Sequence, residues 1–445
     1  MRRAAKAAAV GLLSVALFGL GALGFARSRG GSPSAAVLGG ATSSLQSHPV
    51  IQAGSLGAAI TDLQARIRSL PTDWRSFAGL GLAYVQQARI TADPSYYPKA
   101  EGVLQRSLAL NGNGNFDGLT GMAALSAARH DFSGALAWGE RAKAVNPYSA
   151  NAFAVVGDAL VELGRYGEAF AEFQRMIELR PDLSTYARVS YAQELQGDLP
   201  EALRAMRLAF QSAGTAADSA WASNQLGELE WNQGNVAAAE RFYRQALDAD
   251  PSYLPPHAGV GKVAEARGDR ATAIREFTLL VERYPLPEYV IALGDLYTVS
   301  GKPGLAARQY ALVHTEERLL QANGVNVDLE IALFDADHRS NVAEGLARAQ
   351  AEWKRRQSVH VADALAWTLY ASGRTEEALT YANRSLQLGT RSALFHFHRG
   401  MIERALGRTV AARRDLAAAL GINAHFSILW SRQAARILSS LGTRP

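Results

Sequence analysis

The residues with the clearest potential for chemistry are two histidines near the C-terminus. His396 and His398 lie two positions apart in a segment that predicts a helix. Successive helical residues are rotated by about 100°, so these two side chains point about 200° apart and cannot bind one metal ion together. We therefore interpret them as histidines of a groove or a helix interface rather than as zinc ligands.

A second candidate is a short stretch with three oxygen or nitrogen donors, Asp335, Asp337 and His338, near the end of a predicted helix. Calcium and zinc sites need more ligands at defined spacing. Acidic and amide side chains also occur commonly at helix ends without any metal. We interpret the stretch as a solvated turn, and the sequence predicts no metal and no other cofactor.

Catalytic motifs are absent from the chain. Glu316 and Glu317 are adjacent in a predicted helix, which places them on different faces. The sequence has no H-E-x-x-H, no P-loop and no G-x-S-x-G. Gly19–Gly24 fits the spacing G-x-G-x-x-G, but a dinucleotide site also needs a preceding strand and a βαβ unit. Because cysteine is absent too, thiolate metal sites and cysteine nucleophiles are excluded, and we expect a protein that is not an enzyme.

The excess positive charge is concentrated at the N-terminus. The chain has 46 basic and 41 acidic residues. Five of the basic residues lie in the first 29 positions, where there is no acidic residue, and the rest of the chain has 41 of each sign. A nucleic-acid binder presents a concentrated basic face. The formally neutral body therefore predicts no nucleic-acid partner.

Residues 1–26 form a segment that can enter a membrane. A basic start precedes 20 apolar residues, Ala7–Ala26, which are enough for a helix across a bilayer. The segment is either an uncleaved signal anchor or a cleaved signal peptide that ends at Ala26, and Arg27 directly after it favours the anchor. Residues 27–54 are rich in Gly, Ser and Ala and predict a flexible linker. We expect a body outside the cytoplasm, in a single-pass protein of the cell membrane, or a secreted protein if the N-terminus is cleaved.

Most of the chain repeats one short element, a Gly followed five positions later by an Ala. The copies are Gly164/Ala169, Gly197/Ala202, Gly234/Ala239, Gly268/Ala273, Gly301/Ala306, Gly373/Ala378 and Gly407/Ala412, and an eighth has His130 in place of Gly before Ala135. Successive alanines are 33 to 37 residues apart, except for one interval of 72 that spans two units. A sustained period of this length indicates an array of helical repeats.

Each residue type in the element has a mechanical reason. Gly ends one helix because it reaches the left-handed conformation without strain, and Ala lets two helices cross closely. A second Gly recurs inside each first helix, which implies close helix contact, and an aromatic residue recurs in the second helix as a core anchor. These glycines are Gly157, Gly227, Gly261, Gly294 and Gly400, and the aromatic residues are Phe173, Tyr243, Phe277 and Tyr310.

The pattern resembles the tetratricopeptide repeat, a helix–turn–helix unit of about 34 residues with the signature W-x2-L-G-x2-Y…A-x3-F…P. Phe77–Tyr84 and Leu293–Tyr297 fit its first half. The resemblance covers residues 74–426, in ten units that begin near Trp74, Phe116, Ala150, Leu183, Ala220, Leu254, Pro287, Val325, Val359 and Ala393. The unit near Val325 departs furthest from the signature and is placed by phase alone.

The resemblance implies an all-α fold, a right-handed α-solenoid of about ten antiparallel helix pairs behind the N-terminal membrane or signal helix. Residues 55–73 predict a leading helix, and residues 427–445 predict a C-terminal capping helix and tail. Terminal repeats need such a cap because one face is otherwise bare.

In tetratricopeptide proteins the first helices line a concave groove that holds extended peptides or partner helices. Projected onto this chain, the pattern predicts a largely acidic partner-binding groove with two tryptophans. Its residues are Asp158, Glu162, Tyr191, Glu194, Trp221, Asn224, Glu228, Trp231, Asn232, Lys262, Glu265 and Asp295. Aromatic residues anchor partners and carboxylates favour basic ones.

The expected function is therefore that of a non-enzymatic scaffold or adaptor at the cell envelope that binds protein partners in its groove. The alternative is an exported small-ligand-binding accessory protein of a transporter or envelope-polymer system. A closed pocket lined by the residues from Trp221 to Asn232 would favour this alternative, because small ligands occupy enclosed sites with convergent polar groups.

Overall fold

The computed structural model describes residues 53–442, and all the regular structure in this range is helical. It contains 22 helices, which confirms the predicted all-helical solenoid. The predicted signal or membrane segment and nearly all of the linker lie outside the described residues. Within residues 53–442, no helix combines the length and apolar character needed to cross a bilayer.

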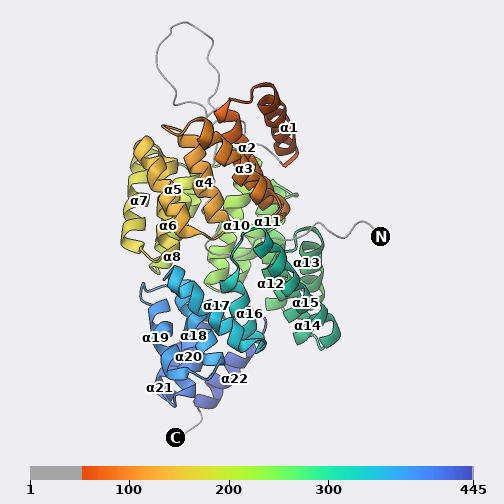
Figure 1. Ribbon diagram of the computed structural model, residues 1–445. Coiled ribbons are helices and arrows are strands. Elements are labelled where there is room, and N and C mark those ends of the chain that lie inside the picture. Colours follow the sequence, from red (N-terminus) through yellow and green to blue (C-terminus); the bar gives the residue numbers. More distant parts are fainter. Residues whose placement is uncertain (1–52, 443–445) are drawn as a thin grey trace.

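Ten helix pairs follow the leading helix α1 (Ala53–Ser69), and α22 (Ser431–Leu441) comes after them (Figure 1). The first helices are α2 (Trp74–Thr91), α4 (Phe116–Ala128), α6 (Ala150–Glu162), α8 (Leu183–Leu195), α10 (Ala216–Asn232), α12 (Pro256–Ala266), α14 (Pro287–Val299), α16 (Asp328–His338), α18 (Val359–Ala371) and α20 (Ala393–Ala405). The second helices are α3 (Tyr96–Leu110), α5 (Phe132–Val145), α7 (Tyr166–Leu179), α9 (Leu199–Gln211), α11 (Val236–Ala249), α13 (Arg270–Arg283), α15 (Pro303–Ala322), α17 (Val342–Arg355), α19 (Thr375–Ser385) and α21 (Thr409–Ile422).

Within a pair, an aromatic ring of the second helix lies on the interior glycine of the first. A Cβ atom added at Gly157 would lie 2.4 Å from the Phe173 ring, and one at Gly294 would lie 2.4 Å from the Tyr310 ring. Gly227 and Gly261 have the same relation to the rings of their own pairs. The close helix contact predicted from these glycines is therefore present, and a side chain at these positions would force the two helices apart.

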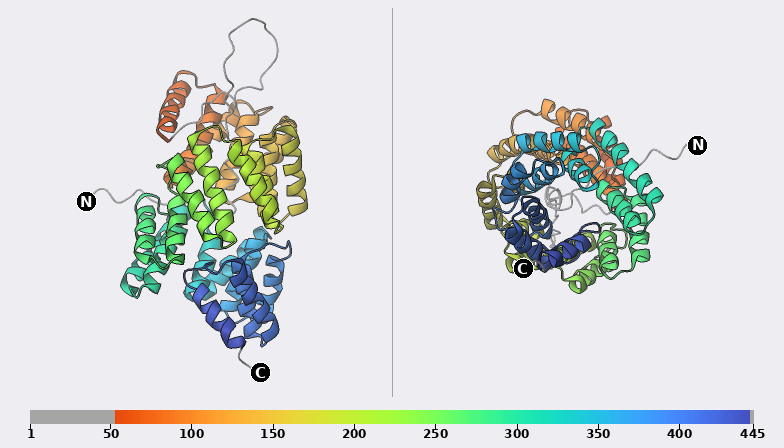
Figure 2. Two further views of the ribbon diagram at one scale, coloured as in Figure 1. Left: turned by 180° about the vertical axis from the view of Figure 1, so that it is seen from behind. Right: turned by 90° about the horizontal axis from the view of Figure 1, so that it is seen from below.

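The array winds into a superhelix that is ring-like when viewed along its axis, and its second turn lies against its first (Figure 2). Residues separated by 192 to 196 positions contact one another at several places along the ring. The Tyr284 hydroxyl donates to the Arg89 carbonyl at 2.5 Å, and the Asn423 side-chain amide donates to the Trp231 carbonyl at 2.8 Å. One apolar cluster joins buried residues of α2–α4 to buried residues of α14–α16, so the core also crosses between the turns.

The recurring corner glycine serves two purposes, depending on its place in the superhelix. Gly164 and Gly197 have positive φ values, and a Cβ there would lie 2.4 Å and 2.3 Å from backbone oxygens of Gln357 and Gly389 in the second turn. Gly407 also has positive φ, but a Cβ there meets nothing within 4 Å. In the first turn the glycine therefore permits close stacking as well as the helix corner.

A buried ionic contact fixes the two turns together. Arg356 of the second turn bonds to Glu162 of the first turn and to Glu352, and all three side chains are buried. Burial raises the pKa of Glu162 to about 7, against the opposing charge of Arg356. The Val359 amide next to this contact donates to the Tyr166 hydroxyl at 2.7 Å. Removing one partner of such a pair leaves an uncompensated buried charge.

Replacing Gly197 by Ala is expected to destabilise the chain more than replacing Gly407 by Ala. Both positions have a left-handed backbone, so each substitution loses about 1–2 kcal/mol to backbone strain. Only at Gly197 does the new methyl group also collide with the second turn, which adds roughly 1–3 kcal/mol. Thermal unfolding followed by circular dichroism measures the difference, and equal losses would show that the turns are apart in solution.

Candidate functional site

Most charged residues of the predicted groove pair with the neighbouring first helix. Each pair joins the first helix of one unit to that of the next, as expected for side chains that share the inner face. The pairs are Asp158–Arg188 (2.6 Å), Glu194–Asn232 (2.9 Å), Glu228–Lys262 (2.7 Å) and Asp295–His338 (2.9 Å). The negative charge of this face is thus largely compensated inside the chain.

The remaining predicted groove residues are also engaged. Glu162 bonds to Arg356 between the turns, and Glu265 lies 3.4 Å from Arg432 of α22. Trp221 is half-buried against an apolar cluster of α6–α10. The others are buried in the repeat interior, namely Tyr191, Asn224 and Trp231.

The candidate metal ligands diverge to separate partners. Asp335 is fully buried and pairs with Arg348 at 3.1 Å, so its interpretation as part of a solvated turn is wrong. A cation from the following helix compensates the charge that the sequence alone assigned to solvent. His396 bonds to Asp415 and His398 to Asp363, at 3.0 Å and 2.9 Å. Across residues 53–442 the structure assembles no group of three or more potential metal ligands.

Hydrogen bonding favours the protonated form of His338. Its Nδ1 lies 2.8 Å from the Phe334 carbonyl and its Nε2 lies 2.9 Å from the Asp295 carboxylate. Both partners are acceptors, so both ring nitrogens must donate. Burial lowers the pKa of His338, but the bond to Asp295 and its charge outweigh burial, and the pKa is raised. The Tyr310 hydroxyl also donates to Asp295, at 2.8 Å.

Two tryptophans close to this histidine share one carboxylate. The indole N–H groups of Trp367 and Trp430 each donate to the same oxygen of Asp337 at 2.8 Å. Their rings meet edge to face with centroids 6.1 Å apart. Trp367 also stacks on Tyr370 at 4.9 Å and on His398 at 4.1 Å. A single acid of α16 thereby sets the orientation of one aromatic side chain in α18 and of another just before α22.

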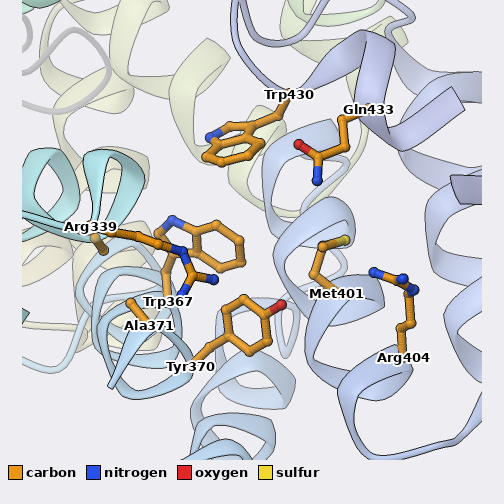
Figure 3. A pocket seen from close by; sticks show the side chains of 9 residues that line it. Arg339, Trp367, Tyr370, Ala371, Met401, Arg404, Trp430 and Gln433 are labelled. Atoms are coloured by element: carbon orange, nitrogen blue, oxygen red, sulfur yellow. The ribbon is translucent and has the colours of Figure 1, made fainter. Parts of the chain in front are cut away.

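These rings line a cavity of about 250 Å³, the tryptophan pocket, in the second turn (Figure 3). It is formed by side chains of α16, α18, α20 and α22. The lining residues are Ala336, Arg339, Trp367, Tyr370, Ala371, Met401, Arg404, Trp430 and Gln433. The walls are aromatic and thioether groups, and the polar ends of two arginines and a glutamine stand around them.

Arg339 and Arg404 are the charged groups of the tryptophan pocket. Both are exposed, and neither has an acidic partner among the residues that the structure describes. Arg339 ends α16 with φ of 51°, a left-handed conformation that non-glycine residues rarely adopt. Such strain concentrates at functional sites. Exposed arginine beside tryptophan and tyrosine is the composition of an interaction hot spot.

A second and wider cavity lies on the other side of Trp430. Its volume is about 740 Å³, it is open to solvent, and most of its lining is apolar. It lies among α14, α15, α16 and the segment before α22. The lining residues are Thr298, Val299, Tyr310, Ala311, His314, Phe334, Asp337, His338, Ser340, Leu429 and Trp430. Trp430 therefore forms a shared wall of the two cavities.

Neither cavity contains a residue of the predicted groove. The sequence analysis considered Asp337 and His338 only as metal ligands, and rejected that role. The pair Trp367 and Tyr370, three positions apart in a first helix, is the one signal that could have indicated an aromatic surface there. The sequence gives no comparable signal for Trp430, which lies beyond the last repeat.

Replacing Asp295 by Asn is expected to lower the pKa of His338. In the native chain the His338 pKa lies above its ordinary value because of Asp295. The Asp295→Asn variant keeps the burial, which disfavours the charged ring, and loses the compensating charge. The stability that comes from this pair is present at low pH and is lost as pH rises through the raised pKa. Histidine-selective NMR titration measures the shift; an unchanged value would contradict the pairing.

Comparisons with known proteins agree with the repeat pattern. Residues 150–183, 222–253 and 364–425 match sequence models described as tetratricopeptide repeat. A comparison with curated proteins finds no significant match.

Solved structures with helical repeats resemble the chain at low identity. The human IFIT1 dimer with PPP-AAAA has 15% identity and a TM-score of 0.46, covering 82% of this chain and 86% of that one. Cut9–Hcn1 of the APC/C has 16% identity and a TM-score of 0.39, covering 86% and 81%. PilW, a type IV pilus biogenesis factor, has 16% identity and a TM-score of 0.39, covering 46% and 97%.

The three matched segments lie in both turns of the superhelix: residues 150–183 span α6 and α7, residues 222–253 cover part of α10 and all of α11, and residues 364–425 cover part of α18 and all of α19, α20 and α21. Over these residues the chain thus resembles the tetratricopeptide repeat, and the tetratricopeptide repeat family is the one that these matches support.

Proposed function

We propose that this protein is a non-enzymatic scaffold that binds other proteins, and that the tryptophan pocket is one of its docking sites. The partner segment would present a carboxylate to Arg339 or Arg404 and an apolar or aromatic side chain to Trp367 and Trp430. Stacked helical repeats supply the extended surface that such binding needs. Tetratricopeptide repeats generally mediate contacts between proteins, which supports this class of function.

One observation carries the choice of site. Arg339 and Arg404 are exposed, have no acidic partner among the described residues, and line a cavity together with tryptophan and tyrosine rings. They flank rings whose orientation is already fixed by Asp337. Because these rings are already held in place, binding a partner would cost this protein little conformational entropy.

The proposed location is the cell envelope, with the repeat body outside the cytoplasm. The support comes from the sequence: a basic start, then 20 apolar residues, then a linker rich in Gly, Ser and Ala. In that setting an anchored array would recruit or organise neighbouring envelope proteins. The chain carries none of the catalytic motifs considered above, which supports a scaffold over an enzyme.

A charge reversal of the two arginines tests the proposed site. We expect the Arg339→Glu/Arg404→Glu variant to weaken binding of an acidic partner by about 2 kcal/mol or more, over tenfold in Kd. Both residues are exposed, so the fold should persist, and circular dichroism checks this. Affinity capture after crosslinking in intact cells, followed by mass spectrometry, identifies the partner whose Kd is then measured.

Arg413→Glu is the matched control, because Arg413 is exposed on α21 and lies outside the lining of both cavities. A partner that is lost with the double variant and kept with the control supports the proposed site. A partner that is kept with the double variant but lost with Trp221→Ala places binding in the central groove and overturns the proposed site. Absence of any enriched protein would contradict the scaffold function.

The cavity of about 740 Å³ favours a second candidate, a small-ligand-binding protein. Its size lies within the range of about 300–1,000 Å³ that is usual for such sites, and most of its lining is apolar. We expect Ala311→Trp, which fills the cavity, to abolish binding of a co-purifying small molecule seen by native mass spectrometry. Ala307→Trp is the control on the same helix, outside the lining. A protein without any bound small molecule would contradict this candidate.

A further inference from the structure

An exposed row of residues on α15 repeats with the spacing of a coiled coil. Leu305, Leu312 and Leu319 lie seven positions apart and are 38%, 42% and 39% exposed. Residues seven apart fall almost in line on a helix, because two turns take about 7.2 residues. Arg308, Thr315 and Ala322 are exposed as well, three positions after each leucine, so the apolar row is one leucine per heptad with small or polar residues beside it. We call these six residues the α15 stripe.

The helix that carries the stripe is unusual within the array. α15 has 20 residues, whereas the other second helices have 11 to 15. The residues that follow each leucine, Ala306, Val313 and Leu320, lie about 100° around the helix and are buried in the repeat core. Figure 1 shows α15 beside α13 and α14 at one edge of the molecule, away from α18–α21. The extra length continues the leucine spacing, since Leu319 lies beyond the usual end of a second helix.

The charge around the stripe has a single sign. Arg308 and Arg318 are exposed on α15, and Lys302 precedes the helix. None of the three has an acidic partner among the described residues. The two acids of α15, Glu316 and Glu317, are buried and turned away from solvent. A second copy of this helix would bring like charges together, which disfavours self-association.

We propose that the α15 stripe is a docking surface for an acidic amphipathic helix of a partner protein. The partner's apolar heptad positions would pack between the three leucines, and its flanking carboxylates would face Arg308 and Arg318. The partner helix would lie along the row of three leucines, over about two heptads. This surface is separate from the tryptophan pocket, so one can fail while the other holds.

A photo-crosslinking amino acid at Leu312 of the full chain, in the cells that produce it, tests the proposal. Mass spectrometry of the crosslinked peptide identifies the residue that lies on the stripe. The expected product is a peptide from another protein with apolar residues at heptad spacing and an excess of Asp and Glu. The same probe at Val410, which is 85% exposed on α21, should not give this product.

A triple variant, Leu305→Ser/Leu312→Ser/Leu319→Ser, removes the apolar row and so tests whether the leucines bind the crosslinked partner. We expect it to reduce capture of the same partner at least tenfold, with an unchanged circular dichroism spectrum. Leu208→Ser is the control, because Leu208 is equally exposed on α9. Arg339→Glu/Arg404→Glu should leave this capture unchanged.

Several outcomes would overturn the proposal. A crosslink to a second copy of this chain would show self-association, and a crosslink to lipid would show a membrane-facing surface. A crosslinked peptide that is basic or lacks heptad spacing would contradict the proposed chemistry. The absence of any crosslink specific to Leu312 would show that the stripe is bare in the cell.

Discussion

Contact between the two turns of the superhelix is the constraint on which the rest of the structure depends. A repeat that touches only its neighbours can vary in curvature at little energetic cost. Here particular groups of the second turn must reach particular carbonyls of the first, such as those of Arg89 and Trp231. The separation of 192 to 196 residues is not a whole number of repeats. The turn between the two helices of a first-turn unit therefore contacts the connection between two units of the second turn. These contacts set the rise of the superhelix.

The sequence could specify the helix pairs but not this stacking. The Gly and Ala period predicted ten pairs because both residues act on neighbouring helices, within about 34 residues of chain. Glu228 and Lys262, 34 positions apart in successive first helices, pair at 2.7 Å, a contact that lies within reach of the same local period. The partner of Glu162 is Arg356, 194 residues away. That pairing depends on the curvature of the whole array, which cannot be predicted from the spacing of residues within one repeat.

The tryptophan pocket could not be predicted from the sequence for a related reason. Its walls come from α16, α18 and α20 and from Trp430, which lies after the periodic part of the chain. Asp335 and Asp337 are two positions apart and were interpreted together, but the helix directs one to Arg348 and the other to the two indoles. The burial of these two acids depends on the cation and the indole donors that neighbouring segments supply. A single sequence identifies the acidic residue but does not show which residue will lie next to it in the fold.

Charged residues of the inner surface fall into two groups within the described part of the chain. Some already pair with an opposite charge of this chain, and others are free to pair with a partner protein. A desolvated carboxylate is tolerated when a cation lies within bonding distance, and removing that cation is costly. Most acids of the first helices meet this condition, so a basic ligand would have to break existing pairs to use them. Arg339 and Arg404 meet no acid of the described chain, and a ligand carboxylate can approach them without breaking any bond. An acidic partner of Arg339 and Arg404, as proposed, would leave the ion pairs of the predicted groove intact.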